Sequence, residues 1–291
     1  MSVGGPVRAA EARAVRGLAA RRDAGDFQRT PLPDPGGGFL LQAVCDPYAV
    51  GATGTGPLIL SWNGTLWEKE TLPALDPALS GAMLTGVAGR VAVGGAFDRL
   101  AGAETPLLLC RDDTGWTEEK APGTGFPYVL TGVHGDWAVG HGFPGTAVLH
   151  RGLTGWAPVA VPGRPVRLLA VASHGSRLWA GGERDREGLL LSFDGRTWKE
   201  HRTKTGPVTA LALRHGRPWA AAGRTLLEWT GRRWARHTAP LSVNALAVSA
   251  TGRLCAAGAG RWGLYDGRRW RLHVLPGTWL GADPAWLVGS A

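Results

Sequence analysis

The chain of 291 residues is poor in several residue types, and each scarcity excludes some classes of protein. It has four lysines, two methionines and three tyrosines, so arginine carries almost all of its formal net charge of +9. No apolar run approaches the roughly 20 residues that cross a bilayer as a helix. The N-terminus lacks the apolar stretch of a secretory signal. The composition therefore predicts a cytoplasmic protein that makes no membrane contact.

Cysteine is equally scarce, with three copies that are far apart in the sequence. This number and spacing fit neither a disulfide framework nor a metal knuckle. Each lies within an apolar run, so we expect Cys45, Cys110 and Cys255 to be buried free thiols. We expect no metal and no other cofactor, because no ligand spacing or phosphate-binding loop is present.

Glycine and tryptophan are abundant by contrast, with 45 and 14 copies, and they mark an internal repeat. The stretch LTGVHGDWAVG at 130–140 resembles LTGVAGRVAVG at 84–94 and WLGADPAWLVG at 279–289. Six repeats continue with an apolar strand, a short polar turn and a tryptophan. These tryptophans are Trp67, Trp116, Trp156, Trp198, Trp234 and Trp270. Four short strands in about 40 residues make up one blade of a β-propeller.

The first strand of each repeat has a small residue two positions before its turn. Seven positions share this feature: Ala43, Gly86, Gly132, Ala170, Ala212, Ala247 and Gly281. Because the innermost strands of a propeller crowd together near its axis, they require small side chains. The sequence therefore predicts an all-β, seven-bladed propeller with four-stranded blades, a single domain over residues 1–291.

The seventh blade is predicted to be shared between the two ends of the chain. Complete repeats occupy about 39–80, 81–122, 128–163, 166–204, 208–241 and 243–277, and the last begins at Thr278 with only two strands. Residues 8–36 contain two further strands, with Phe27 in the tryptophan position. Pairing them with residues 278–291 would close the ring and remove open sheet edges. The alternative is that residues 7–22, rich in alanine and arginine, form a helical tail.

The turn motif resembles a degenerate Asp-box, the Ser-x-Asp-x-Gly-x-Thr-Trp hairpin of sialidase-like propellers. SFDGRTW at 192–198 is one residue short of it. The repeat resembles the tryptophan-rich Asp-box and kelch-like propellers of bacteria over nearly the whole chain. This resemblance implies a fold and leaves function open, because such propellers include hydrolases, lectins, assembly factors and scaffolds. It implies structural roles for Asp194, Gly195, Trp198, Asp266, Gly267 and Trp270.

Strand alternation assigns the loops to two faces. The turns between first and second strands, and between third and fourth, are short and uniform, and we call their side the turn face. The loops between second and third strands and the links between blades differ in length, and we call their side the variable-loop face. A rigid scaffold normally binds on its variable loops. The candidate binding residues there are Asp98, Arg99, Glu104, His141, Glu183, Arg184, Asp185, Arg224, Arg261 and Trp262.

These candidates would form a polar rim with an aromatic anchor, which suits a peptide, a protein or a small polar ligand. We expect a monomeric, non-catalytic scaffold or accessory protein of a bacterial pathway. Changing Glu183, Arg184 or Trp262 to alanine should leave stability nearly unchanged, as exposed loop substitutions usually do. The alternative for ERDRE at 183–187 is a solvated loop whose charges pair locally.

Two other function classes stay open. A hydrolase- or lyase-like enzyme would pair Asp98 or Glu104 with Glu183 or Asp185, two blades away. A lectin would need an aromatic and polar pair in every blade, and Trp262 has no clear counterparts.

The histidines do not form a catalytic or metal site in this prediction. His134, with Asp136, lies in a first turn, where a polar residue is expected. His201, His237 and His273 each follow a repeat tryptophan by three residues, on outer strands of three blades that are too far apart for one metal.

A basic surplus lies between residues 205 and 275, with eleven arginines and two acids. TGRRWARH and DGRRWRLH would gather part of it on the turn face of blades five and six. The residues are Arg232, Arg233, Arg236, Arg268, Arg269 and Arg271. Such a patch fits an acidic protein, with nucleic-acid phosphates as the less favoured alternative. Each arginine could instead be a soluble turn residue that stacks on a neighbouring tryptophan.

Overall fold

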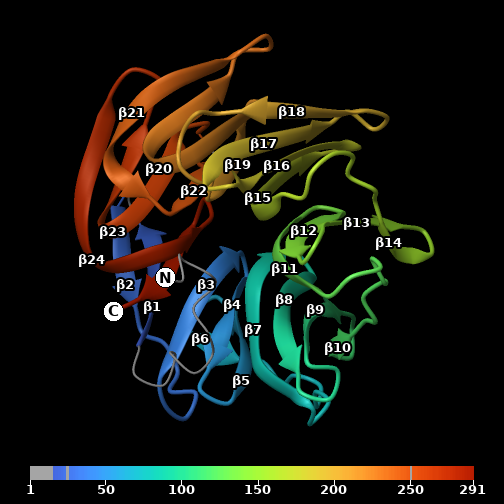
Figure 1. The fold of residues 1–291 in the computed structure, drawn as a ribbon. Coiled ribbons are helices and arrows are strands. Elements are labelled where there is room, and N and C mark those ends of the chain that lie inside the picture. The colour runs from blue at the N-terminus through green and yellow to red at the C-terminus, as the bar shows by residue number, and fades with distance from the viewer. Residues whose placement is uncertain (1–15, 24–25, 250) are drawn as a thin grey trace.

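The computed structural model describes residues 16–23, 26–249 and 251–291. Every regular element in these ranges is a β-strand, and among them no helix could cross a membrane. The strands form six sheets around a central axis, with the first strand of each repeat nearest to it (Figure 1). The predicted all-β propeller is therefore confirmed.

Four sheets have four antiparallel strands in sequence order, as the repeat predicts. The first contains β3 (Phe39–Cys45), β4 (Tyr48–Thr53), β5 (Gly56–Trp62) and β6 (Trp67–Lys69). The second contains β7 (Leu79–Ala88), β8 (Val91–Asp98), β9 (Ala103–Arg111) and β10 (Trp116–Glu118). The third contains β11 (Tyr128–His134), β12 (Trp137–Gly142), β13 (Thr146–Gly152) and β14 (Gly155–Pro158). The fourth contains β15 (Arg167–His174), β16 (Arg177–Arg184), β17 (Glu187–Phe193) and β18 (Trp198–Arg202).

The other two sheets differ because several strands continue through a predicted loop. The fifth contains β19 (Ala210–Arg214), β20 (Arg217–Trp229) and β21 (Trp234–Val243). The sixth has six strands in the order β2-β1-β25-β24-β23-β22. Its members are β1 (Gly17–Asp23), β2 (Asp26–Thr30), β22 (Ala245–Val248), β23 (Leu254–Tyr265), β24 (Trp270–Ala282) and β25 (Trp286–Ser290).

The structure thus has six sheets, and the predicted count of seven blades is not confirmed. The difference lies in β24, whose 13 residues pair first with β23 and then with β25. Because the strand does not break at Gly277, two predicted repeats share one hydrogen-bonded ladder.

The N-terminal strands complete the sixth sheet. β1 pairs with β25, with Ala19 opposite Val288, and with β2, with Arg22 opposite Phe27. The alternative of a helical tail is wrong for residues 17–22, which are strand. Residues 1–15, which include the rest of that predicted segment, lie outside the described residues.

Small residues lie where the first strands of neighbouring repeats meet. A Cβ atom added to Gly281 would lie 2.7 Å from the Ala43 Cα, and one added to Gly86 would lie 2.9 Å from the Gly132 Cα. Real Cβ atoms do not approach a backbone atom so closely, so the packing of inner strands requires glycine at these two positions. The crowding predicted from the sequence is present.

A β-bulge precedes the small residue in five of these strands, as at Thr85 and Thr131. The Thr85 hydroxyl donates to the Leu130 carbonyl of the next sheet at 2.9 Å, and the Thr131 hydroxyl donates to the Leu168 carbonyl at 2.9 Å. Bulges re-aim a side chain out of the ladder. Here they produce hydrogen bonds that join neighbouring sheets near the axis.

Aromatic rings fill the interfaces between sheets. Trp286 of the sixth sheet contacts Trp62 of the first at 4.9 Å between ring centroids, and Trp179 of the fourth contacts Trp229 of the fifth at 5.5 Å. Such pairs contribute packing energy beyond their buried area. The sheets therefore form a rigid scaffold on which the loops are placed.

The three cysteines are free, as expected. Cys110 and Cys255 are buried and Cys45 is partly buried. Burial raises the pKa of the Cys110 thiol to about 11 and that of Cys255 to about 12, so neither is a reactive thiolate at neutral pH.

Candidate functional site

A cleft of about 590 Å³ opens on the variable-loop face between the third and fourth sheets. Its walls are the end of β12, the link over residues 164–167 that leads into β15, and the turn from β16 to β17. It brings together four of the predicted binding residues: His141, Glu183, Arg184 and Asp185. Their proximity depends on the way neighbouring sheets pack.

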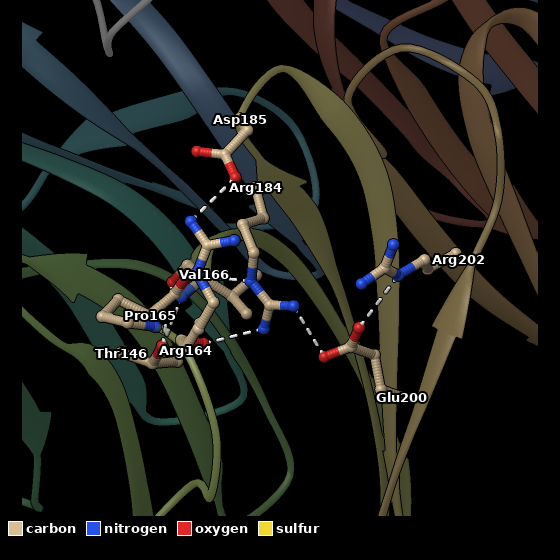
Figure 2. Close-up of polar contacts among 8 residues, drawn as sticks. All are labelled: Thr146, Arg164, Pro165, Val166, Arg184, Asp185, Glu200 and Arg202. Carbon is tan, nitrogen blue, oxygen red and sulfur yellow. Dashed lines mark hydrogen bonds and ion pairs between the residues drawn. The ribbon is translucent and has the colours of Figure 1, made fainter.

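Arg184 is a buried anchor of the cleft wall (Figure 2). Its guanidinium donates to the Arg164 carbonyl at 2.7 Å and to the Glu200 carboxylate at 2.8 Å, and its Nε donates to the Pro165 carbonyl at 3.2 Å. Only 12% of the side chain is exposed. The expectation that Arg184 is a freely exposed loop residue is therefore wrong, because the link before β15 folds over it.

The floor of the cleft holds an ion pair and a histidine. Arg167 donates to the Glu183 carboxylate at 2.9 Å, and only 12% of the Glu183 side chain is exposed. Arg167 Nε also donates to His141 Nε2 at 3.4 Å. Burial, helped by the charge of Arg167, lowers the pKa of His141 to about 4. At neutral pH this histidine is uncharged, and the floor combines a hydrogen-bonded cation, an anion and a neutral ring.

The rim of the cleft is the two-residue turn between β16 and β17. Asp185 and Arg186 have φ angles of 52° and 67°, a region that glycine and asparagine usually occupy in such turns. Arg164 forms an ion pair with Asp185 at 3.0 Å (Figure 2). Arg186 is exposed and makes no hydrogen bond or ion pair with the described part of the chain. The rim therefore presents a free guanidinium to solvent.

An exposed aromatic residue stands beside the cleft. Phe143, 89% exposed, is at the tip of the loop between β12 and β13, which Gly142 and Gly145 close with two reciprocal amide–carbonyl hydrogen bonds of 3.1 Å. Gly142 and Gly145 line the cleft. On the other side of this loop, Pro144 and Phe126 line a second hollow of about 430 Å³. Phe143 itself lines neither hollow, but its neighbours in the loop line both.

Four site residues were not among those predicted from the sequence: Arg164, Arg167, Arg186 and Phe143. The first two belong to a link between repeats and meet their acidic partners only after folding, 21 and 16 residues further along the chain. Phe143 had a local signal, a phenylalanine within the glycine- and proline-rich loop HGFPGT at 141–146.

The candidates of the second sheet stay apart from the cleft. Asp98 uses one carboxylate oxygen to accept the Leu100 and Ala101 amides at 2.8 and 3.0 Å, which shapes its own loop. Arg99 donates to the Ala78 carbonyl at 3.2 Å, and Glu104 is exposed on β9. None of the three lines the cleft. The cleft therefore does not join Asp98 or Glu104 with Glu183 or Asp185, as the enzyme alternative would require.

Arg224, Arg261 and Trp262 do not lie on open loops, because β20 and β23 run through the predicted loops with only a bulge. Arg224 donates to the Ala239 carbonyl at 3.2 Å, and Arg261 lies in the ladder opposite Val274. Trp262 is fully buried. Its ring stacks on His273 at 4.2 Å, so the prediction of an exposed aromatic anchor here is wrong.

The basic patch of the turn face is only partly as predicted. Arg232 and Arg233 are exposed on the β20–β21 turn, and Arg268, Arg269 and Arg271 are exposed at or beside the β23–β24 turn.

Arg236 points elsewhere. It donates to the carbonyls of Thr203 and Lys204, so it connects β21 to the link after β18 and is not part of the patch.

The aspartates of the polar turns are bound to their own backbone. Asp194 accepts the Thr197 and Arg196 amides at 2.8 and 3.0 Å, and these bonds lower its pKa to about 2. Asp266 accepts the Arg268 and Arg269 amides at 2.7 and 2.9 Å. Both carboxylates therefore have structural roles.

His134, His201 and His237 also have structural roles. His134 Nδ1 lies 3.0 Å from the Ser173 hydroxyl of the next sheet. His201 and His237 pack against Trp179 and Trp219. In the described ranges, no three His, Cys, Asp or Glu side chains are grouped so that they could hold a metal ion.

No protein-family model and no curated protein matches this chain. Among solved structures it is similar to the extracellular domain of a hybrid two-component system from B. thetaiotaomicron, with a TM-score of 0.59 and 12% identity over 90% of this chain and 39% of that chain. A second is the extracellular domain of a one-component system from the same organism, with a TM-score of 0.57 and 12% identity over 95% and 38%. A third, described as a gluconolactonase, has a TM-score of 0.46 and 14% identity over 69% and 84%.

The chain spans about two fifths of the length of the first two solved chains. At 12% identity the likeness extends to the arrangement of the backbone alone. The chain has the fold of a β-propeller.

Proposed function

We propose that the chain is a non-catalytic binding propeller that holds a peptide or protein segment in the cleft between its third and fourth sheets. The observation that carries this proposal is the combination of a concave polar surface with a free guanidinium, that of Arg186, and an exposed aromatic residue, Phe143. Aromatic residues and arginine are enriched among the residues that carry most of the binding energy at protein interfaces. An apolar residue of the segment would contact Phe143, and an acidic residue would pair with Arg186.

The internal ion pairs of the cleft favour binding over catalysis. Glu183 is paired with Arg167 and Asp185 with Arg164, so neither carboxylate is placed as a free acid or base. A catalytic carboxylate instead needs a pKa matched to proton transfer at the working pH.

The oligomeric state, the location in the cell and the class of repeat belong to the same proposal. We propose a monomeric scaffold or accessory protein in a bacterial cytoplasm, whose repeats are seven degenerate Asp-box or kelch-like units, two of them sharing the sixth sheet. The free cysteines are consistent with a reducing compartment. The two similar solved structures above are extracellular domains, so cell fractionation of the tagged chain is the test of location.

Selection of peptides from a random phage-displayed library tests the binding function. Peptides that bind the wild-type chain should bind Phe143→Ala and Arg186→Gln about five- to tenfold more weakly, because each variant removes one contact of roughly 1 kcal/mol. Leu153→Ala is the matched control, since Leu153 is fully exposed in the β13–β14 turn on the opposite face. Selected peptides whose affinity is the same for all four proteins would show that the cleft is not the binding site.

A further inference from the structure

An arginine cluster lies on the turn face of the fifth and sixth sheets. We define it as Arg214, Arg217, Arg253, Arg268 and Arg269. They come from three turns, which join β19 to β20, β22 to β23 and β23 to β24. Three of the five were not in the predicted patch, because the turns that carry them become neighbours only in the folded ring.

Arg214 connects the three turns. Its Nε donates to the Gly252 carbonyl at 2.7 Å, and one terminal nitrogen donates to the Asp266 carbonyl at 2.9 Å. The His215 ring lies against Gly252, where an added Cβ would be 2.5 Å from it. The turns are therefore fixed relative to one another, and the surface is formed before anything binds, which lowers the entropic cost of binding.

The charge of this cluster is not neutralised within the chain. Asp266 is the one acidic residue of the three turns, and its carboxylate already accepts the Arg268 and Arg269 amides. These bonds, with the nearby charges of Arg253 and Arg271, lower the pKa of Asp266. In the described residues no carboxylate lies within ion-pair distance of the cluster's guanidinium groups.

We propose that this cluster is a second docking surface and that it binds an acidic protein segment, rich in aspartate and glutamate. Several guanidinium groups on rigid turns can each hold a carboxylate with two parallel hydrogen bonds. The surface is on the opposite side of the molecule from the cleft, so the proposal does not depend on the one made for the cleft. With both faces occupied, the propeller would hold two partners at once.

The aromatic residues beneath the cluster favour an acidic protein over a nucleic acid. Surfaces that bind single-stranded nucleic acid stack bases on free aromatic rings. Here Tyr265 packs against Trp219 at 5.8 Å and stacks on Trp270 at 5.1 Å, so these rings already have partners. The arginine side chains are therefore the groups that a partner would contact first.

Fluorescence anisotropy with a labelled peptide of alternating glutamate and glycine tests this surface. The wild-type chain should bind the peptide at low salt, and binding should weaken as salt screens the charges. The same peptide with glutamine in place of glutamate should not bind. The triple variant Arg217→Gln, Arg268→Gln and Arg269→Gln should bind the acidic peptide about tenfold more weakly, because it lacks three of the guanidinium groups that would pair with the carboxylates.

The matched control removes three exposed arginines elsewhere, in the variant Arg16→Gln, Arg90→Gln and Arg202→Gln. It has the same net charge, and its affinity should stay within about twofold of wild type if the site is local. Thermal melts of both variants check that the fold survives.

Three outcomes would overturn the proposal. The first is that the acidic peptide does not bind the wild-type chain. The second is that the two triple variants lose equal amounts of affinity for the peptide. The third is that a DNA duplex of the same charge binds more tightly than the peptide, and that the cluster variant abolishes this DNA binding. The last outcome would assign the surface to nucleic acid.

Discussion

The Trp286 indole donates a hydrogen bond of 3.0 Å to the Asp46 carboxylate, across 240 residues of sequence. Asp283, in the turn before Trp286, accepts the Asp46 amide at 2.6 Å and the Ala285 and Trp286 amides at 2.7 Å each. These bonds join the sixth sheet to the first on the turn face. The ring is thus held together here by polar contacts as well as by the pairing of β1 with β25.

Asp283→Ala should lower the free energy of unfolding by about 1–3 kcal/mol, because one buried amide and two partly buried amides lose their acceptor. Chemical denaturation monitored by tryptophan fluorescence measures the change. Asp136→Ala is the matched control, since Asp136 is exposed in the equivalent turn of the third sheet. Equal effects of the two substitutions would contradict a special role for Asp283.

Gly86→Ala should destabilise the fold by about 1–3 kcal/mol, because the new methyl group would overlap the backbone of the next sheet. Gly132→Ala is the matched comparison. A Cβ at Gly132 would lie 3.3 Å from a Val171 methyl group, which can shift slightly. Calorimetric melting of both variants should therefore rank Gly86→Ala as the less stable, and the reverse order would refute the proposed inner packing.

Trp262→Ala should destabilise the fold by about 3–5 kcal/mol, because the ring is fully buried between Phe27 and His273. The sequence predicted that this substitution would leave stability nearly unchanged, and the buried position of the ring reverses that prediction. Trp198, which is only partly buried, should cost less when changed to alanine. Urea titration of both variants is the measurement. A Trp262 variant as stable as wild type would place this residue back on the surface.

Arg184→Ala should cost about 1–3 kcal/mol of unfolding free energy, because two carbonyls and a carboxylate lose their donor. Arg186→Ala, at the exposed rim, should stay within about 0.5 kcal/mol. The two variants separate the arginine with a structural role, Arg184, from the one that we propose binds a partner, Arg186. Similar melting temperatures for both variants would mean that the cleft wall does not depend on Arg184.

Stability should fall as the pH is lowered from about 6.5 towards 4, in part through His141. Burial lowers the pKa of its folded state to about 4 from the usual 6.5, so the unfolded chain takes up a proton that the folded chain rejects. The effect fades as the pH rises above 6.5, where the unfolded chain also loses this proton. His134 and His201 contribute with the same sign, because burial lowers their pKa values too.

Urea midpoints at pH 7 and pH 5 test this linkage. His141→Gln should reduce the difference between the two midpoints, whereas His174→Gln, at an exposed turn residue, should leave it unchanged. A variant with the same pH dependence as wild type would show that His141 is not the responsible group.

Much of the fold could be predicted because its signals are local or periodic. The alternation of apolar residues, the short polar turns and the small residues near the axis each act within one repeat or between equivalent positions of neighbouring repeats. Asp194 and Asp266, for example, cap turns that begin at their own residue. Such contacts require no knowledge of where distant segments lie.

Part of the candidate site could also be predicted, since His141, Glu183, Arg184 and Asp185 lie on the face with variable loops. Their roles could not, because a loop sequence does not show which arginine is covered by the preceding link. Arg184 is buried under the link before β15, whereas Arg186, two residues later, is exposed.

An all-β propeller of Trp-rich repeats could be predicted from the residues alone, because strand period and turn chemistry act over a few residues. Three features became visible in the folded ring: β24 joins two repeats in one sheet, Trp262 is part of the core, and Arg214, Arg253 and Arg268 share a surface. Each of these depends on contacts between separate strands or turns, whose geometry is set by the closure and twist of the whole ring.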